Sequence, residues 1–390
     1  MTKSNLLRIS IISYLLTLTA GSAVVLPFIV KDNAASILGS TTEYAGYVFS
    51  FFMIGMFAMQ YLNGFVVKVI SLKWEIVLIC VINLLCTIAM QFVSSMAELL
   101  PILVVLGLSF GAVITIPNYM IVNSYEQSAR SARLNRNDMF FSIGSFFIPY
   151  VAGYLLADKL TWADAYAVNL IVLAIVFVLL MGTKLPELEC KEALKKGIAY
   201  SKWTLNVYLI GIAIFFYFVS YVGFTYWLQP YFSSLGLPIQ TATLGVTLFW
   251  LFYGLGCFIS SFVVQKYPVH RYMIVSAIIA CLTYALIFYS QQVVGLYMLI
   301  SLLGLSCSTL FSSSISYGSL LLEKPSPRVV SFFITASGVG TFVGEFYSSY
   351  IQNTFGFGSL VLSSAVAMGI TVFIYLYVMS SVRKNCSLTL

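Results

Sequence analysis

The sequence is poor in charge and in histidine, and its cysteines are not paired. Of its 390 residues only 8% are Asp, Glu, Lys or Arg, against about 25% in a typical soluble domain, whereas 60% are hydrophobic. So little charge cannot cover a water-exposed surface, which excludes a soluble globular protein. The composition indicates a chain whose main solvent is lipid.

Residues for metal, nucleophile and nucleotide chemistry are also scarce. The one histidine, His270, lies in a short polar segment beside Arg271, and the seven cysteines show no paired spacing. A zinc site and a His-based catalytic triad are therefore excluded. The chain also lacks the Gly-x-x-x-x-Gly-Lys loop that binds nucleotide phosphates. We expect no enzyme activity, no cofactor and no metal.

The chain does contain twelve apolar runs of about twenty residues. At 1.5 Å per helical residue, such a run crosses a hydrocarbon core of roughly 30 Å. Helices are required, because backbone groups in lipid must bond within their own segment. The predicted runs lie near residues 9–30, 44–67, 74–93, 99–123, 139–157, 163–183, 204–232, 241–264, 271–290, 293–321, 329–352 and 357–382.

The basic residues predict the orientation of these spans. With the N-terminus in the cytoplasm, only Lys31 and Lys159 of the 20 Lys and Arg residues lie outside. This bias is the positive-inside pattern, and it requires an even number of spans, with both termini cytoplasmic. The net charge of +7 is then explained by topology, and no nucleic-acid partner is expected.

A charged segment at mid-chain divides the spans into two equal sets. We predict an N-terminal six-helix bundle (1–183), a cytoplasmic linker (184–203) and a C-terminal six-helix bundle (204–390). Arg136, at the start of the fifth run, lines up with Arg328 of the eleventh at an offset of 192 residues. Six spans per half make the two repeats parallel in the membrane.

Four stretches carry a family resemblance: MTKSN with ISYLLTLTAG, SYEQSARSARLNRNDMFFSIGSFFIP, VGFTYWLQPYFSSLGL and KPSPRVVSFFITASGVGTF. With the two six-span halves, they resemble the major facilitator superfamily over the whole chain, and more narrowly its TsgA branch, related to the fucose permeases. The resemblance implies secondary transport by alternating access in a bacterial inner membrane, with substrate bound near the midplane. Lys68 occupies the place of the acidic residue in the superfamily's Gly-x-x-x-Asp signature.

Glu345 is the candidate for proton coupling, as the only carboxylate well inside a predicted span. An unpaired carboxylate is expensive in a bilayer and tends to take up a proton. Two simpler interpretations stay open: a neutral glutamic acid bonded to a neighbouring helix, or a residue close enough to the outer surface to be wet.

The substrate-binding candidates lie in the fourth and seventh runs. Asn118 and Tyr119 follow Pro117, which bends a helix. Tyr221, Tyr226 and Gln229 offer aromatic faces and an amide to a sugar-like solute. Interhelical hydrogen bonding and an interfacial aromatic belt are the alternatives.

The fourth and fifth runs meet at a cluster of charges that is a candidate cytoplasmic gate. Its members, with one from the eleventh run, are Glu126, Arg130, Arg133, Arg136, Asp138 and Arg328. Salt bridges between such residues latch a gate in one state. Anchoring by the positive-inside effect is the alternative.

We therefore predict an all-α integral membrane transporter, a monomer, that moves a small polar, sugar-like solute by alternating access with protons as the coupling ion. Its partners are membrane lipid and the small-molecule substrate. The alternatives are an efflux carrier for a toxic molecule or oxyanion, and a membrane sensor that keeps a transporter fold without transport.

Overall fold

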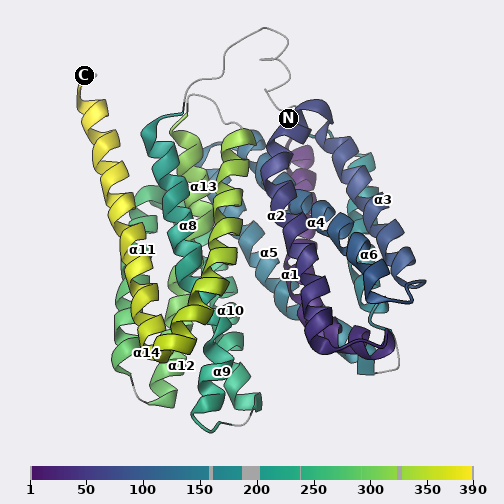
Figure 1. The fold of residues 1–390 in the computed structure, drawn as a ribbon. Helices are drawn as coiled ribbons and strands as arrows, with labels where there is room; N and C mark the ends of the chain where they lie inside the picture. Colours follow the sequence, from purple (N-terminus) through teal and green to yellow (C-terminus); the bar gives the residue numbers. More distant parts are fainter. Residues whose placement is uncertain are drawn as a thin grey trace. The chain divides into compact units, whose positions relative to one another are not determined.

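The computed structural model describes residues 2–157, 161–186, 203–237, 239–290, 292–322 and 327–388. Within these ranges the chain consists of helices and short connections, and no strand occurs (Figure 1). The helices are α1 (Lys3–Ile37), α2 (Thr42–Val69), α3 (Leu72–Met90), α4 (Met96–Ser124), α5 (Gln127–Ala157), α6 (Asp164–Met181), α8 (Leu205–Tyr226), α9 (Leu228–Ser234), α10 (Ile239–Lys266), α11 (Val269–Tyr289), α12 (Val293–Cys307), α13 (Leu310–Leu320) and α14 (Pro327–Leu388).

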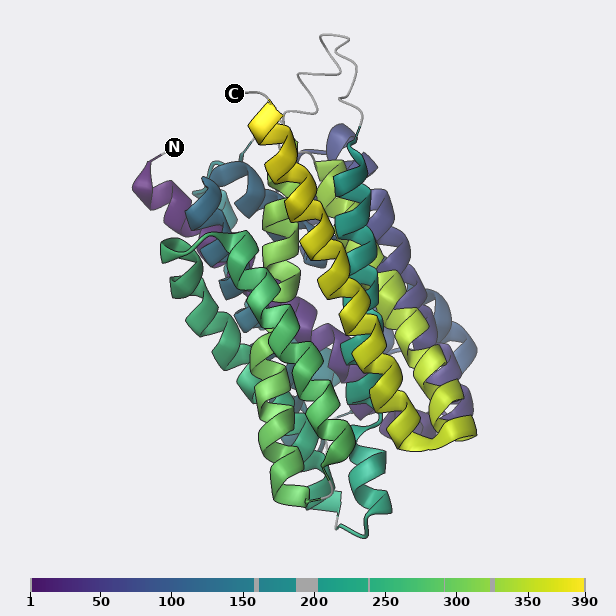
Figure 2. The ribbon, with the colours of Figure 1, turned by 90° about the vertical axis from the view of Figure 1, so that its left-hand side faces the viewer.

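Ten helical stretches among the described residues are long and apolar enough to cross a membrane. One of them, Arg328–Val382, has 55 residues and belongs to α14, which is broken at Gly356 (φ 81°, ψ 174°). Figure 2 shows α14 turning back on itself, so that it forms two arms. Counting α5 and both arms of α14 separately would give the twelve spans predicted from the sequence, and that count stays a prediction.

The chain forms two compact units. Unit 1 comprises Met1–Tyr125, Phe140–Ala199 and Ser326–Ser331, and unit 2 comprises Glu126–Met139, Tyr200–Pro325 and Phe332–Leu390. Helices α5 and α14 thus contribute to both. The predicted boundary at 184–203 stays a prediction, since residues 187–202 lie outside the described part of the chain.

Short polar segments set where the helices of unit 1 begin. The hydroxyls of Thr41, Ser71 and Ser95 accept hydrogen bonds from backbone N–H groups three residues on, at 3.2–3.5 Å. Such N-caps satisfy N–H groups that have no partner inside the helix. The helices α2, α3 and α4 therefore start where the hydropathy pattern changes.

Glycines bring α2 and α4 into backbone contact in unit 1. A Cβ at Gly107 would lie 2.1 Å from the carbonyl oxygen of Phe52, and one at Gly55 would lie 2.4 Å from that of Val104. Small residues allow this close approach, which gives helices in lipid their van der Waals contact.

The same contact recurs in unit 2, between α10 and α12. A Cβ at Gly304 would lie 2.3 Å from the carbonyl oxygen of Phe249. Gly304 follows Gly107 by 197 residues, and Phe249 follows Phe52 by the same 197. The recurrence is what a duplicated helical unit would give.

A second glycine contact repeats in the same way. A Cβ at Gly144 of α5 would lie 1.9 Å from the carbonyl oxygen of Leu18, and one at Gly340 of α14 would lie 2.6 Å from that of Phe215. Gly340 follows Gly144 by 196 residues, and Phe215 follows Leu18 by 197. These offsets exceed the 192 predicted from the two arginines by about one helical turn.

Candidate functional site

Five aromatic side chains of α8 and α10 gather inside unit 2. This aromatic cluster consists of Tyr217, Tyr221, Phe249, Trp250 and Tyr253. Tyr221 stacks on Phe249 with ring centroids 6.0 Å apart and lies 6.3 Å from Tyr253. Apart from Trp250, which is half-buried, all are buried. Tyrosine faces and hydroxyls from two neighbouring helices therefore meet in one place.

Asp138 adds a carboxylate to this cluster. The Ser312 hydroxyl of α13 donates a hydrogen bond to its Oδ2. The carboxylate also interacts electrostatically with Tyr221 and Tyr253 of the cluster and with Cys257 of α10. The segment 126–139 of α5 belongs to unit 2, so all these contacts lie within one unit.

The sequence analysis placed Asp138 just before the fifth apolar run, whereas α5 begins at Gln127, eleven residues earlier. Hydropathy marks the part of a helix that faces lipid, so it missed the polar first turns of α5. Glu345 as the carboxylate well inside a predicted span stays a prediction, and Asp138 is a second carboxylate to consider. Asp138 lies within a helix and contacts buried groups.

The tyrosines of the cluster were mostly missed from the sequence. Only Tyr221 was singled out, although Phe249, Trp250 and Tyr253 stand together in the run FWLFY at 249–253. Their position within a predicted span, away from either end, is the signal that distinguishes them from an interfacial belt.

The cluster has the chemistry of a site for a polyhydroxylated solute. Aromatic faces cover the apolar face of a sugar-like ring, while hydroxyls and a carboxylate exchange hydrogen bonds with its hydroxyl groups. Sites for small molecules are mostly apolar and aromatic, with few polar groups that fix orientation. The cluster and Asp138 supply both kinds of group.

Two of the predicted substrate-binding residues lie in unit 1. Asn118 is buried and its Nδ2 donates to the carbonyl oxygen of Ile114, one turn back in α4, at 2.9 Å. Tyr119 is fully buried, and its hydroxyl is hydrogen-bonded to that of Ser331. The Asn118 amide is thus engaged with its own helix, and Tyr119 with the first turn of α14.

The other two, Tyr226 and Gln229, lie between Tyr221 and Phe249 along the chain. Tyr226 ends α8 and is 51% exposed, with its ring edge-on to Trp227 at 5.9 Å. The structure does not bring it together with Tyr221. The side chain of Gln229 lies outside the described part of the chain.

Glu345 lies on α14 in unit 2, in a half-buried position. Its neighbour Gly344 packs on α8, where a Cβ would lie 3.1 Å from the Cα of Val219. Phe346, on its other side, is 67% exposed. Glu345 therefore lies at the edge of the α8–α14 contact, apart from the aromatic cluster.

The predicted gate residues are divided between the units. Arg328 belongs to unit 1, where its guanidinium lies 5.4 Å above the ring of Phe65. In unit 2, Arg136 donates from Nε to the Ser261 hydroxyl at 3.4 Å and lies 5.4 Å above the ring of Phe262. The other predicted members, Glu126, Arg130 and Arg133, belong to unit 2; of these Arg130 is buried and Glu126 is exposed.

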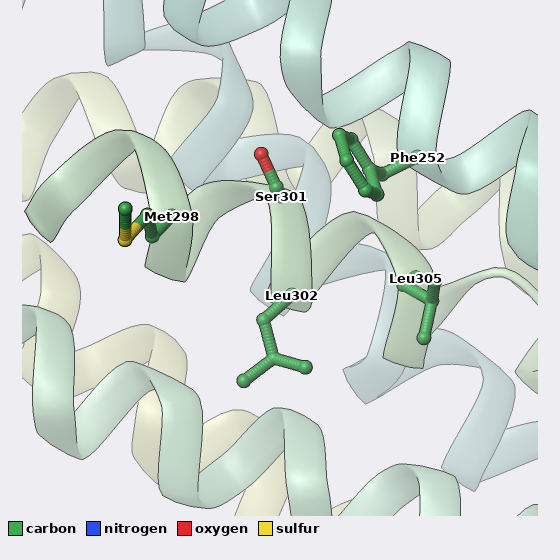
Figure 3. Close-up of a pocket in the computed structure, with 5 residues that line it drawn as sticks. All are labelled: Phe252, Met298, Ser301, Leu302 and Leu305. Atoms are coloured by element: carbon green, nitrogen blue, oxygen red, sulfur yellow. The ribbon is translucent and has the colours of Figure 1, made fainter. Parts of the chain in front are cut away.

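Unit 2 also has a cavity of about 310 Å³ between α10 and α12 (Figure 3). Its lining consists of Phe252, Met298, Ser301, Leu302 and Leu305. Met298 is 69% exposed and both leucines are exposed, so this hollow belongs to the apolar outer surface. None of the predicted site residues lines it.

Comparison with known proteins identifies the family of this all-helical chain with many apolar helices. A family model described as the Major Facilitator Superfamily matches residues 9–345. The chain therefore belongs to the Major Facilitator Superfamily of multi-pass membrane transporters.

Within that superfamily the chain falls in the TsgA branch. It is 30% identical to the Protein TsgA homolog of Citrobacter koseri over 343 residues, 87% of each chain. The E. coli fucose:proton symporter FucP has the same fold, with a TM-score of 0.77 and 17% identity over 96% of this chain and 99% of that one. The proton:xylose symporter XylE matches with a TM-score of 0.77 and 14% identity over 97% and 96%. The prediction of a major facilitator fold is confirmed.

Proposed function

We propose that the protein is a proton-coupled carrier of a small, sugar-like polar solute in a bacterial inner membrane, which it moves by alternating access. The observation that carries the proposal is the half-buried carboxylate of Asp138, which accepts a hydrogen bond from Ser312 and interacts electrostatically with the tyrosines of the aromatic cluster. Ionisable residues at membrane depth are costly, and they mark substrate and ion pathways.

The aromatic cluster supports the solute class. Tyr221 and Tyr253 are only 6% and 4% exposed, so the cluster is closed to solvent in the conformation described. A carrier opens and closes its site in turn, and a site of this kind would become accessible when unit 2 faces an open cavity. The fold shared with two sugar:proton symporters supports the same class.

The first experiment is a thermal-shift screen of the purified protein against sugars, nucleosides, amino acids and oxyanions. A ligand that binds only the native state raises its melting temperature. We expect stabilisation by a sugar or related polyol. Stabilisation by an oxyanion alone would favour the efflux alternative, and no stabilisation together with no exchange in vesicles would favour the sensor.

Variants then locate the site. We expect Asp138→Asn to weaken binding of the stabilising ligand about tenfold to a hundredfold, since a hydrogen bond to a charged group contributes roughly 1.5–3 kcal/mol. Tyr253→Phe removes one cluster hydroxyl and is expected to weaken binding less. Tyr267→Phe, which alters an exposed tyrosine of unit 2, is the matched control. Equal affinity in Asp138→Asn and the control would place the site elsewhere.

A further inference from the structure

A buried carboxyl group lies in unit 1, far along the chain from the aromatic cluster. Glu75 lies in the first turn of α3 and is only 2% exposed. Both of its carboxyl oxygens are buried and have no partner at full hydrogen-bond geometry among the described residues, although the Asn63 amide is close enough to interact with them. Buried polar groups are almost always paired, so two unpaired oxygens on one carboxyl group require an explanation.

The polar neighbours on α2 add further unpaired acceptors. The Asn63 side chain faces the Glu75 carboxyl. Asn63 is fully buried, and its Nδ2 donates to the Thr115 hydroxyl of α4, while its Oδ1 has no partner among the described residues. Gln60, one turn earlier on the same helix, is 3% exposed and its Oε1 is also unpaired. Four buried oxygens of this cluster thus lack a partner at full hydrogen-bond geometry among the described residues.

The charged groups of the packed helices point elsewhere. On α2, Lys68 lies 4.8 Å above the ring of Phe65, and Arg328 of α14 lies 5.4 Å above the same ring. Phe65 is two residues from Asn63, so it lies on a different face of α2. On α3 itself, Lys73 is exposed.

The remaining titratable groups are engaged or distant. The Tyr119 hydroxyl of α4 is bonded to Ser331. On α6, Asp164 accepts from Gln91 at the opposite end of α3, roughly 24 Å along the helix axis from Glu75. No described cation or hydroxyl is placed to stabilise an ionised Glu75.

We propose that Glu75 and Asn63 form a proton-binding site in unit 1, in which the carboxylic acid form of Glu75 donates a hydrogen bond to a neighbouring amide oxygen. An ionised carboxylate is an acceptor only, whereas the acid form supplies the donor that this cluster lacks. One bound proton removes the buried charge and pairs an orphaned amide oxygen. The site goes beyond the proposed transport function, because its test needs no substrate.

The test compares the melting temperature of the purified protein and of Glu75→Gln across a series from acid to alkaline pH. If the folded chain holds this proton more tightly than the unfolded chain, stability is greatest at acid pH and is lost as pH rises. The wild type is expected to lose several degrees toward alkaline pH, and Glu75→Gln to lose clearly less. Glu98→Gln, at an exposed carboxylate that accepts from Ser94, is the matched control and is expected to keep the wild-type loss of stability toward alkaline pH.

An infrared measurement gives a direct second readout. The carbonyl band of a protonated carboxylic acid should be present in the wild type near neutral pH and diminished in Glu75→Gln. The glutamine amide has nearly the shape of the neutral acid, so failure of Glu75→Gln to fold at any pH would contradict the proposal. Equal pH slopes in the two proteins would also contradict it. Selective stabilisation by sodium over choline at alkaline pH, lost in Glu75→Gln, would identify a metal-cation site and overturn the proton assignment.

Discussion

Three carboxyl groups in the helices have different surroundings. Asp138 accepts a hydrogen bond from Ser312 and interacts electrostatically with two tyrosines of the aromatic cluster. Glu75 has no partner at full hydrogen-bond geometry among the described residues, and Glu345 is half-buried at a helix contact. A carboxyl group keeps its charge where donors or cations stabilise it, and takes up a proton where they are missing. The three groups are therefore suited to different roles, and each requires its own variant.

Glu345 can be tested as the coupling residue by substitution with glutamine. If its carboxyl group carries the transported proton, Glu345→Gln should still exchange substrate across the membrane of vesicles without a proton gradient. The same variant should lose the substrate accumulation that a proton gradient drives. The amide cannot take up and release a proton in this range. Asp164→Asn, at a carboxylate that is bonded to Thr161 and Gln91 in unit 1, serves as the control and should keep both activities. Gradient-driven accumulation by Glu345→Gln at the wild-type level would exclude the role.

At the scale of the elements, the glycine contacts predict where added volume is tolerated. A Cβ at Gly107 would meet the Phe52 carbonyl oxygen at 2.1 Å, so Gly107→Ala must push α2 and α4 apart. Overpacking of this kind costs typically 1–3 kcal/mol, and we expect a lower melting temperature in detergent. Gly46→Ala, on α2 with nothing within 4 Å, should leave the melting temperature unchanged or slightly raised. Equal melting temperatures for the two variants would contradict the packing.

The break in α14 depends on one backbone conformation. Gly356 has φ 81° and ψ 174°, a region that is essentially restricted to glycine. Gly356→Ala should lower stability by about 1–3 kcal/mol. Gly358→Ala is the control, because a Cβ there meets only a ring atom of Phe288 at an ordinary 3.6 Å. Similar losses in both variants, measured as the melting temperature, would show that position 356 does not require glycine.

The elements also show what the sequence can and cannot predict. Long apolar runs located most helices, because a bilayer requires hydrophobic length before any packing detail. The first turns of α5 were missed, since their polar and charged side chains give no hydropathy signal. The cluster around Tyr221 and Asp138 was not predicted because it depends on which faces of α5, α8 and α10 meet, and this is decided by tertiary packing. The glycine contacts show the same limit, since only the backbone geometry gives the 197-residue register.

At the scale of the whole molecule, the two units repeat one packing scheme while their polar interiors differ. Each unit has a glycine contact between its second and fourth predicted helices, at matching positions. Unit 2 holds the aromatic cluster with Asp138, whereas unit 1 holds Glu75 among buried amides. A duplicated scaffold keeps the backbone contacts that maintain the fold, and the side chains that line its interior are free to diverge. The aromatic cluster of unit 2 and the buried amides and carboxyl group of unit 1 are examples of that divergence.

The orientation of the molecule in the membrane is predicted by its basic residues and can be tested directly. Ser4→Cys is made in a background without other cysteines. It should be protected from a membrane-impermeant maleimide in intact spheroplasts and labelled after permeabilisation, because residue 4 precedes the first predicted span and is expected on the cytoplasmic side. Gln292→Cys, in the exposed connection before α12, should be labelled in intact spheroplasts. Lys and Arg are retained on the cytoplasmic side during insertion, so only this orientation leaves Lys31 and Lys159 alone outside. The reverse labelling pattern would invert the topology. Labelling of both positions in intact spheroplasts would require an even number of spans between them instead of the odd number predicted, and would overturn the span count on which the two-bundle arrangement depends.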